Sequence, residues 1–120
     1  MNEIKLPDSE IKVMDILWEY KELSAKDTAQ RMNEAYGWKK NTTYTVLKKL
    51  QEKGVIERSE PGFICKPIIG REQVGRTETK SLLDRFYKGS AATLFSAFLK
   101  DKSISNEEID EIKAMIEKMK

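Results

Sequence analysis

The chain has 120 residues, of which 35% are charged and 39% hydrophobic, a balance typical of a folded globular protein rather than a disordered or membrane-embedded one. It contains no histidine and a single cysteine, Cys65, which excludes the common zinc sites, Ser-His-Asp and Cys-His catalytic pairs and an intramolecular disulfide. With 22 basic and 20 acidic side chains, the net charge of +2 does not by itself indicate a nucleic-acid partner.

The N-terminal residues 1–7 contain no apolar run of the kind found in signal peptides. No later stretch approaches the roughly 20 apolar residues that a membrane span needs. We therefore expect a cytoplasmic protein without membrane insertion, and the single cysteine agrees with a reducing compartment.

Two helices are predicted in the first part of the chain. The first covers residues 8–22, where apolar side chains recur at helical spacing from Ile11 to Trp18. The second begins after Ser24, a predicted N-cap with an acidic residue, Asp27, three positions later. Its apolar side runs from Ala25 through Met32 to Tyr36, and Gly37 is expected to end it.

A third helix is predicted over residues 40–53, before Gly54. At 100° per residue, its core face carries Thr43, Val46, Leu47 and Leu50. The opposite face carries Asn41, Tyr44, Thr45 and Lys48, with Glu52 further along. That outward face is mostly cationic and hydrogen-bonding.

A β-hairpin is predicted next. Residues 55–58 and 63–66 have the pattern of short strands on either side of a Pro-Gly turn at 59–62. Cys65 is interpreted as a small apolar residue of the second strand. From residue 67 to about 77 the apolar pattern lapses and Gly70 and Gly75 occur, so we expect a linker or hinge there.

The last 43 residues are predicted to form three short helices. The first is expected to end at Gly89, and Ser105 with Glu108 forms a capping box at the start of the third. Three helices of this size cannot close a core alone, so their apolar faces need a partner surface. Packing against the N-terminal domain would satisfy them, but a homodimer is the favoured prediction. The predicted dimer interface is Leu82, Leu83, Phe86, Tyr87, Leu94, Phe95, Phe98, Leu99, Ile112 and Ile116.

Three helices followed by a hairpin is the element order of a winged helix-turn-helix, in which the third helix enters the major groove of DNA. The predicted fold is mainly α with a small β-hairpin wing: residues 1–70 form the winged-helix domain and residues 71–120 the helical dimerisation region. Charge is unevenly distributed along the chain. Residues 36–58 carry six basic against two acidic side chains, a net of +4, whereas residues 8–22 carry two against five, a net of −3. This pattern favours double-stranded DNA as a partner.

Several stretches resemble the penicillinase repressor family, the BlaI/MecI-type transcriptional regulators, along nearly the whole chain. The similar stretches are residues 13–18 (VMDILW), Trp38, residues 42–54 (TTYTVLKKLQEKG), residues 83–90 (LDRFYKGS) and the segment from Leu99 through Ser105 to Ile109. The resemblance implies a dimeric repressor of β-lactam-resistance or related genes that binds a palindromic operator.

The resemblance also implies the residues that contact DNA. Asn41, Thr42 and Tyr44 are the candidates for reading bases, with Thr45 and Lys48 near phosphates. The remaining candidates for DNA contact are Lys39, Lys40, Lys49 and Arg58. The wing departs from the family pattern, since Phe63 follows the turn glycine where relatives commonly have a basic residue, and Glu60 precedes the turn. We expect this wing to contribute less to binding than usual, with Arg58 and Lys66 in compensation.

In the family, a membrane sensor protease of the BlaR/MecR type induces cleavage within the dimer region. The cleaved bond of the family joins an asparagine to a phenylalanine. In this chain it aligns with Ala97-Phe98, which has the phenylalanine but an alanine in place of the asparagine. The copper-sensing branch of the family uses paired cysteines near the C-terminus, which this chain lacks. We therefore expect no metal site and no cofactor.

Three alternatives remain open. A winged-helix protein-interaction module would have no DNA site of its own, as the modest net charge and Glu60 would allow. A repressor could instead be released by a small-molecule effector. An enzyme is the least favoured interpretation, because no constellation of acidic residues stands out.

Overall fold

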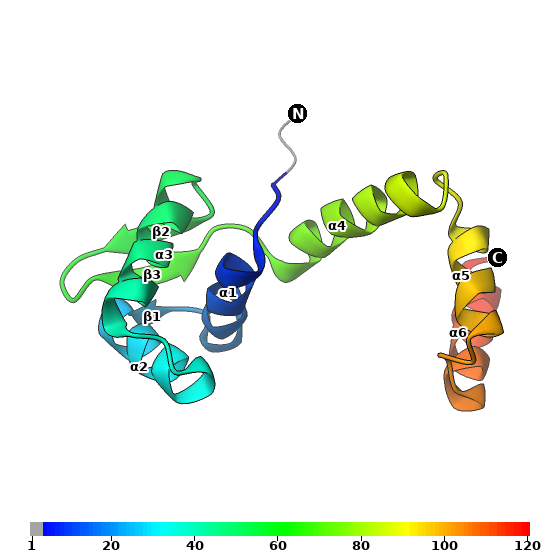
Figure 1. Ribbon diagram of the computed structural model, residues 1–120, viewed down its shortest axis with the longest axis horizontal. Coiled ribbons are helices and arrows are strands. Elements are labelled where there is room, and N and C mark those ends of the chain that lie inside the picture. The colour runs from blue at the N-terminus through cyan, green and yellow to red at the C-terminus, as the bar shows by residue number, and fades with distance from the viewer. Residues whose placement is uncertain (1–3) are drawn as a thin grey trace. The chain divides into compact units, whose positions relative to one another are not determined.

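The computed structural model describes residues 4–120, in which helices predominate and three short strands form one antiparallel sheet (Figure 1). The predicted fold class is therefore confirmed. The elements in chain order are α1 (Asp8–Tyr20), β1 (Leu23–Ser24), α2 (Ala25–Tyr36), α3 (Lys40–Glu52), β2 (Ile56–Ser59), β3 (Ile64–Pro67), α4 (Arg71–Phe86), α5 (Ala91–Lys100) and α6 (Asn106–Met119). The chain divides into two compact units, unit 1 and unit 2, and the division falls after Glu78, within α4.

The sheet of unit 1 has the strand order β1-β3-β2. The predicted hairpin is present, with Arg58 opposite Cys65 and Ser59 opposite Ile64. β1 adds a third strand that the sequence does not reveal, because two residues are too few to show an alternating pattern. Next to this strand, the backbone N–H of Ala25 donates to the carbonyl of Phe63 at 2.9 Å, which ties the wing to the start of α2.

The core of unit 1 lies between α1, α2, α3 and the sheet. The predicted core face of α3 is confirmed, since Thr43, Val46, Leu47 and Leu50 are all buried. From α1 and α2 the main buried side chains are Val13, Met14, Leu17, Ala25, Ala29 and Met32. Because one face of each helix is buried in this core, the rotation of α3 about its axis is fixed and its opposite face is exposed to solvent.

Both ends of α2 follow the predicted capping signals, but the side chain of Tyr36 lies elsewhere than the sequence predicts. Ser24 caps α2 by accepting from the N–H of Asp27 at 3.0 Å, and Gly37 ends the helix with φ of 72°. The sequence predicts Tyr36 on the apolar side of α2, but its side chain is 47% exposed. It packs instead against Trp38, 6.2 Å between ring centroids, and under the ammonium of Lys12.

The linker predicted over residues 67–77 is wrong from Arg71 onward, where α4 begins. The start of α4 is held on unit 1 by Val74, which is buried, and by an Arg71–Asp15 ion pair of 2.7 Å. Just before it, the indole N–H of Trp18 donates to the carbonyl of Ile69 at 2.9 Å. The sequence hides this helix because Val74 is its one fully buried residue, so no apolar stripe develops.

An ion pair joins α1 to the C-terminal end of α3. Glu10 is only 3% exposed, and its Oε1 lies 2.6 Å from Nζ of Lys53. A buried carboxylate needs such a partner, since an uncompensated charge is strongly disfavoured in a protein interior. The pair fixes the position of the last turn of α3 relative to α1.

One buried polar atom of α3 has no partner. Thr43 is fully buried, and its Oγ1 makes no hydrogen bond with the residues that the structure describes. Replacing Thr43 with valine keeps the shape and removes the desolvated hydroxyl, so we expect the free energy of unfolding to rise by about 1 kcal/mol. Urea unfolding followed by tryptophan fluorescence measures this change. A loss of stability would show that the hydroxyl has a partner in solution.

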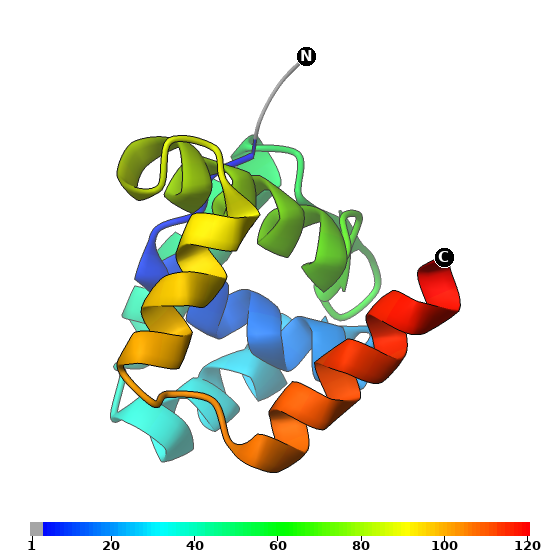
Figure 2. The ribbon, with the colours of Figure 1, turned by 90° about the vertical axis from the view of Figure 1, so that its right-hand side faces the viewer.

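Unit 2 contains the end of α4 together with α5 and α6, which a short connection joins (Figure 2). The capping box predicted at the start of α6 is confirmed, with Ser105 and Glu108 bonded reciprocally. Phe95 and Phe98 of α5 meet edge to face, 6.4 Å between ring centroids. No side chain between residues 79 and 120 is fully buried, so unit 2 has no closed core of its own. None of the helices in residues 4–120 is long and apolar enough to cross a membrane.

Candidate nucleic-acid interface

The exposed side of α3 is the strongest candidate for a functional surface. The structure places the predicted DNA-contacting residues of this segment at the surface, with Tyr44 half-buried: Lys39, Lys40, Asn41, Thr42, Tyr44, Thr45, Lys48 and Lys49. The opposite side of the helix is anchored in the core, so this surface is held rigidly. A rigid helix presenting cations and hydrogen-bonding groups can approach phosphates and base edges together.

Contacts within this surface order two of its side chains. The hydroxyl of Thr45 donates to the carbonyl of Asn41 at 2.9 Å, so its hydrogen is committed to the helix. Nζ of Lys40 lies 5.5 Å from the ring centroid of Tyr44. The first turn of α3 contains no acidic residue and receives no side-chain cap from Lys39. A helix start of this kind favours an anion nearby.

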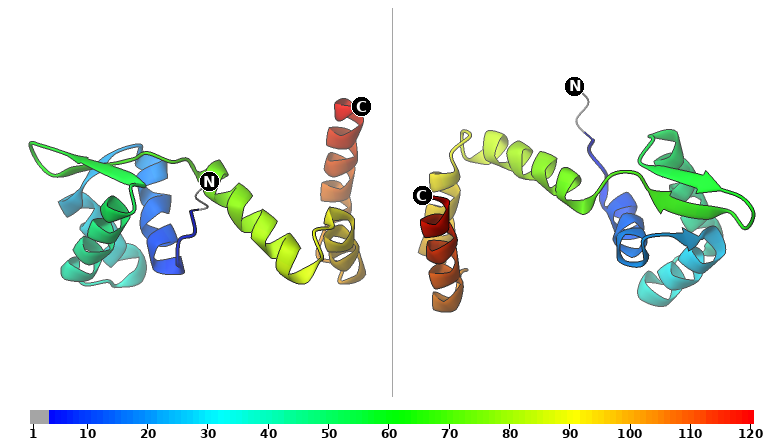
Figure 3. Two further views of the ribbon diagram at one scale, coloured as in Figure 1. Left: turned by 90° about the horizontal axis from the view of Figure 1, so that it is seen from above. Right: turned by 180° about the vertical axis from the view of Figure 1, so that it is seen from behind.

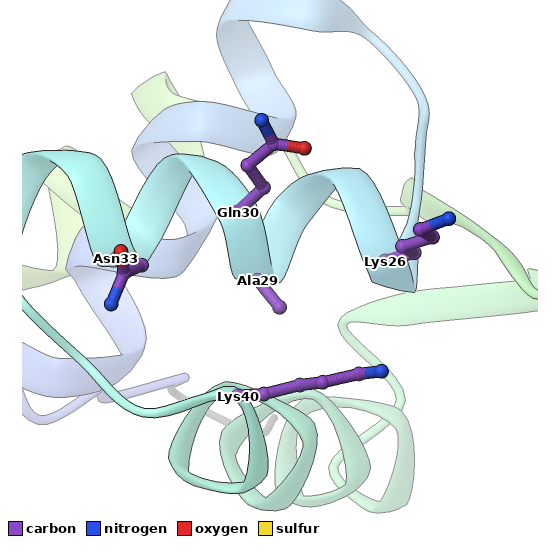
Figure 4. A pocket seen from close by; sticks show the side chains of 5 residues that line it. All are labelled: Lys26, Ala29, Gln30, Asn33 and Lys40. Carbon is purple, nitrogen blue, oxygen red and sulfur yellow. The ribbon is translucent and has the colours of Figure 1, made fainter.

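A pocket of about 270 Å³ lies between α2 and α3, in a place where the sequence predicts no DNA contact apart from Lys40. It is lined by Lys26, Ala29, Gln30, Asn33 and Lys40. Figure 4 shows the side chains of Lys26 and Lys40 reaching toward the same end of the pocket. Positions 26, 30 and 33 are spaced by four and three residues, so they share one face of α2. The recurrence of polar residues at this spacing is the sequence signal that could have identified Lys26, Gln30 and Asn33 as pocket residues. Asn33 also donates to the carbonyl of Trp38 at 3.0 Å, which fixes the turn between the two helices.

The wing, the hairpin of β2 and β3, projects away from the helices of unit 1 (Figure 3). Between the wing and α3 lies a groove of about 650 Å³, lined by Tyr44, Lys48, Gln51, Glu52, Arg58 and Phe63. Arg58, the predicted wing contact, is brought beside the α3 surface. Its Nε donates to Glu60 at 3.0 Å, and its guanidinium lies over the ring of Phe63, so it is already engaged within the wing.

Cys65 lies on β3 and is fully buried, as its interpretation as a small apolar residue predicts. Burial raises the pKa of the Cys65 thiol, and the positive charge of Arg58 opposes that shift only in part. The thiol is therefore neutral at neutral pH and a poor nucleophile. Within residues 4–120, no three cysteine, aspartate or glutamate side chains converge as a metal site would require.

The predicted dimer residues all belong to unit 2 and are half-buried or exposed. Phe86 is 66% exposed and Leu99 54%, while Leu83, Tyr87, Leu94 and Ile112 are half-buried. Leu82, Phe95, Phe98 and Ile116 are also exposed. The Ala97-Phe98 bond lies inside α5, not in a loop. The structure thus gathers the predicted interface residues into one compact unit, within which none of them is fully buried.

Residues 6–118 match the family model described as penicillinase repressor. The penicillinase repressor of Bacillus licheniformis is 26% identical over 118 residues, covering 97% of this chain and 92% of that protein. The methicillin resistance regulatory protein MecI of Staphylococcus aureus is 24% identical over 116 residues, covering 95% and 94%.

Two solved structures share the fold of unit 1. The solution structure of the DNA binding domain of the repressor BlaI has a TM-score of 0.53 and 23% identity, covering 57% of this chain and 85% of that one. The Bacillus licheniformis BlaI monomeric form, solved in complex with the blaP half-operator, has a TM-score of 0.53 and 22% identity, covering 60% and 90%. At this identity the likeness establishes the winged-helix fold.

Proposed function

The chain belongs to the penicillinase repressor family, and we propose that it is a homodimeric transcriptional repressor that binds a palindromic DNA operator through α3 of each protomer. The observation that carries the proposal is the exposed face of α3, which presents cations and hydrogen-bonding groups on a helix anchored in the core. The names of the relatives, penicillinase repressor and methicillin resistance regulatory protein, support control of β-lactam-resistance or related genes.

Within this face we assign base reading to Asn41, Thr42 and Tyr44. An asparagine can bond an adenine edge in two places, and an aromatic ring can contact the methyl group of thymine. Phosphate contacts fall to the cations of this surface and the wing: Lys39, Lys40, Lys48, Lys49 and Arg58. Thr45 is also assigned to a phosphate, which requires its hydroxyl to turn away from the carbonyl of Asn41. Lys26 at the start of α2 extends the same positive surface along the neighbouring helix.

Residues 1–70 are then assigned to DNA binding and residues 71–120 to dimerisation, with the first turns of α4, up to Glu78, packed as part of unit 1. The apolar faces of α5 and α6 support this division, since exposed contiguous apolar surface marks an association site. Homo-oligomers of soluble proteins are most often two-fold dimers, and a two-fold dimer matches a palindromic site.

Release from DNA is assigned to cleavage at Ala97-Phe98 by a membrane sensor protease of the BlaR/MecR type. The bond lies near the C-terminal end of α5, so a cut would separate Phe98 and Leu99 from the rest of the most apolar helix of unit 2. Disruption of the dimer would leave each winged helix with one half-site and without the effective concentration that the second provides.

A titration of the full chain against a duplex from the promoter of its own operon, with complexes separated by gel electrophoresis, tests the function. We expect saturable binding that weakens steeply with salt and that requires both arms of a palindrome. Binding that ignores salt or survives scrambling of both arms would contradict the proposal and favour a protein-interaction role.

Replacing Lys48 with alanine should weaken binding to every duplex, specific or not, because its exposed ammonium is assigned to a phosphate. The slope of log affinity against log salt should flatten by about one unit for each phosphate that a protomer no longer neutralises. The matched variant is Tyr44→Ala on the same face, which should change the preference among operator bases and leave the salt slope unaltered. If both variants alter only the sequence preference, Lys48 does not contact phosphate.

A further inference from the structure

The wing, taken as its two strands and the turn between them, carries no net charge. Between residues 56 and 67 there are two cations, Arg58 and Lys66, and two carboxylates, Glu57 and Glu60. Lys66 stands opposite Glu57 in the register of β2 and β3. Arg58 is bonded to Glu60, with 3.0 Å between Nε and Oε2. Both cations that could reach a phosphate from the wing therefore have an acidic neighbour.

Arg58 is held on two sides. Glu60 occupies its Nε edge, and the ring of Phe63 covers one face of the guanidinium, with Cζ 3.9 Å from the ring centroid. Phe63 has a φ of 54°, which a bulky residue seldom adopts. Its carbonyl accepts the N–H of Ala25, so the sheet fixes this residue in place. The wing is thus built to keep the guanidinium between an aromatic ring and a carboxylate.

We propose that Glu60 lowers the affinity of the wing for DNA by competing with phosphate for the guanidinium of Arg58. This inference rests on the proposed DNA-binding function and concerns the same surface. It identifies Glu60, which no contact assignment to DNA includes, as the residue that sets how strongly the wing binds.

Competition is favoured over a role in orienting Arg58 for three reasons. Glu60 is 59% exposed in its side chain, so its negative charge lies at the surface that would face the backbone, where it repels phosphate. Arg58 is 41% exposed, and an ion pair this open to water is weak enough for an incoming phosphate to replace the carboxylate. A guanidinium binds phosphate best through two parallel N–H donors. Glu60 already accepts from Nε of Arg58, so one of these donors is occupied.

The experiment uses the full chain and a random-sequence duplex of about 30 base pairs, long enough for two half-sites one or more helical turns apart. Glu60→Gln should bind this duplex about three- to tenfold more tightly than the wild type, because the guanidinium of Arg58 then binds its phosphate without a competing carboxylate. The salt slope should steepen by about one unit per protomer. The promoter duplex should show the same gain, since phosphate contacts carry no sequence information.

The matched control is Glu57→Gln, which removes an equal charge from the same hairpin and leaves the Arg58–Glu60 ion pair in place. It should change affinity by less than about twofold, as a screened surface charge does. In an Arg58→Gln background, Glu60→Gln should change affinity by less than about twofold, because the guanidinium for which Glu60 competes is absent. Equal effects of the two glutamine variants, or weaker binding by Glu60→Gln, would overturn competition. Absence of any duplex binding by the wild type would instead refute the proposed function, and this inference with it.

Discussion

Replacing Phe95 with aspartate is expected to convert the proposed dimer into a monomer and to weaken operator binding about 100-fold or more. Phe95 is 41% exposed on α5 and forms an aromatic pair with Phe98 on the apolar face of that helix. A carboxylate placed there would be buried without a partner in any dimer that uses this face. A monomer still binds one half-site, so affinity for a single half-site should stay close to that of the wild type.

Sedimentation and operator titration measure the two effects together. The control is Ser96→Asp, which adds the same charge to α5 at an exposed position about 100° around the helix. It should leave both the mass and the operator affinity unchanged. Both tryptophans, Trp18 and Trp38, belong to unit 1, so their fluorescence reports whether the winged helix itself stays folded. A Phe95→Asp variant that remains dimeric would contradict the assignment of this face.

Replacing Leu47 with alanine is expected to lower the free energy of unfolding of unit 1 by about 2 to 5 kcal/mol. Leu47 is 1% exposed, and its side chain anchors the middle of α3 against the core. The loss combines a smaller buried apolar area with the cavity left behind. Since single domains are stable by only about 5 to 15 kcal/mol, DNA binding should fail at temperatures that the wild type tolerates.

Urea unfolding monitored by tryptophan fluorescence measures this change without a contribution from unit 2. Ile68→Ala is the matched control, because an aliphatic side chain of the same size is removed from a position that is 56% exposed. Its effect should be below about 1 kcal/mol. Equal losses from the two variants would mean that Leu47 is not part of a packed core.

Much of unit 1 could be predicted from the sequence because its helices have well-defined apolar faces. On α3 the positions 43, 46, 47 and 50 follow the helical period, so the spacing alone assigns both the core side and the exposed side. The caps at Ser24 and Ser105 could be predicted for a related reason, since capping depends on residues close in sequence. The DNA-contacting and dimer residues remain predictions, because exposure alone does not identify a partner.

The features that the sequence does not reveal depend on contacts between distant residues or on single buried side chains. α4 is anchored by Val74 and by Arg71 with Asp15, a pairing across 56 positions that no local pattern indicates. β1 exists because two residues happen to pair with β3. The engagement of Arg58 by Glu60 and Phe63 depends on the conformation of the turn between them, which the charges along the chain do not specify.

The lack of any fully buried side chain between residues 79 and 120 has a consequence for the lifetime of the repressor in a cell. In the proposed dimer this region completes its core by pairing, so it would be the least ordered part of an unpaired chain, and proteases act on such opened segments. Newly made or dissociated chains would then be degraded faster than paired ones. Since the unpaired fraction rises as the concentration of repressor falls, each chain would be degraded faster at low copy number. A small fall in copy number would then grow into a rapid loss of repression.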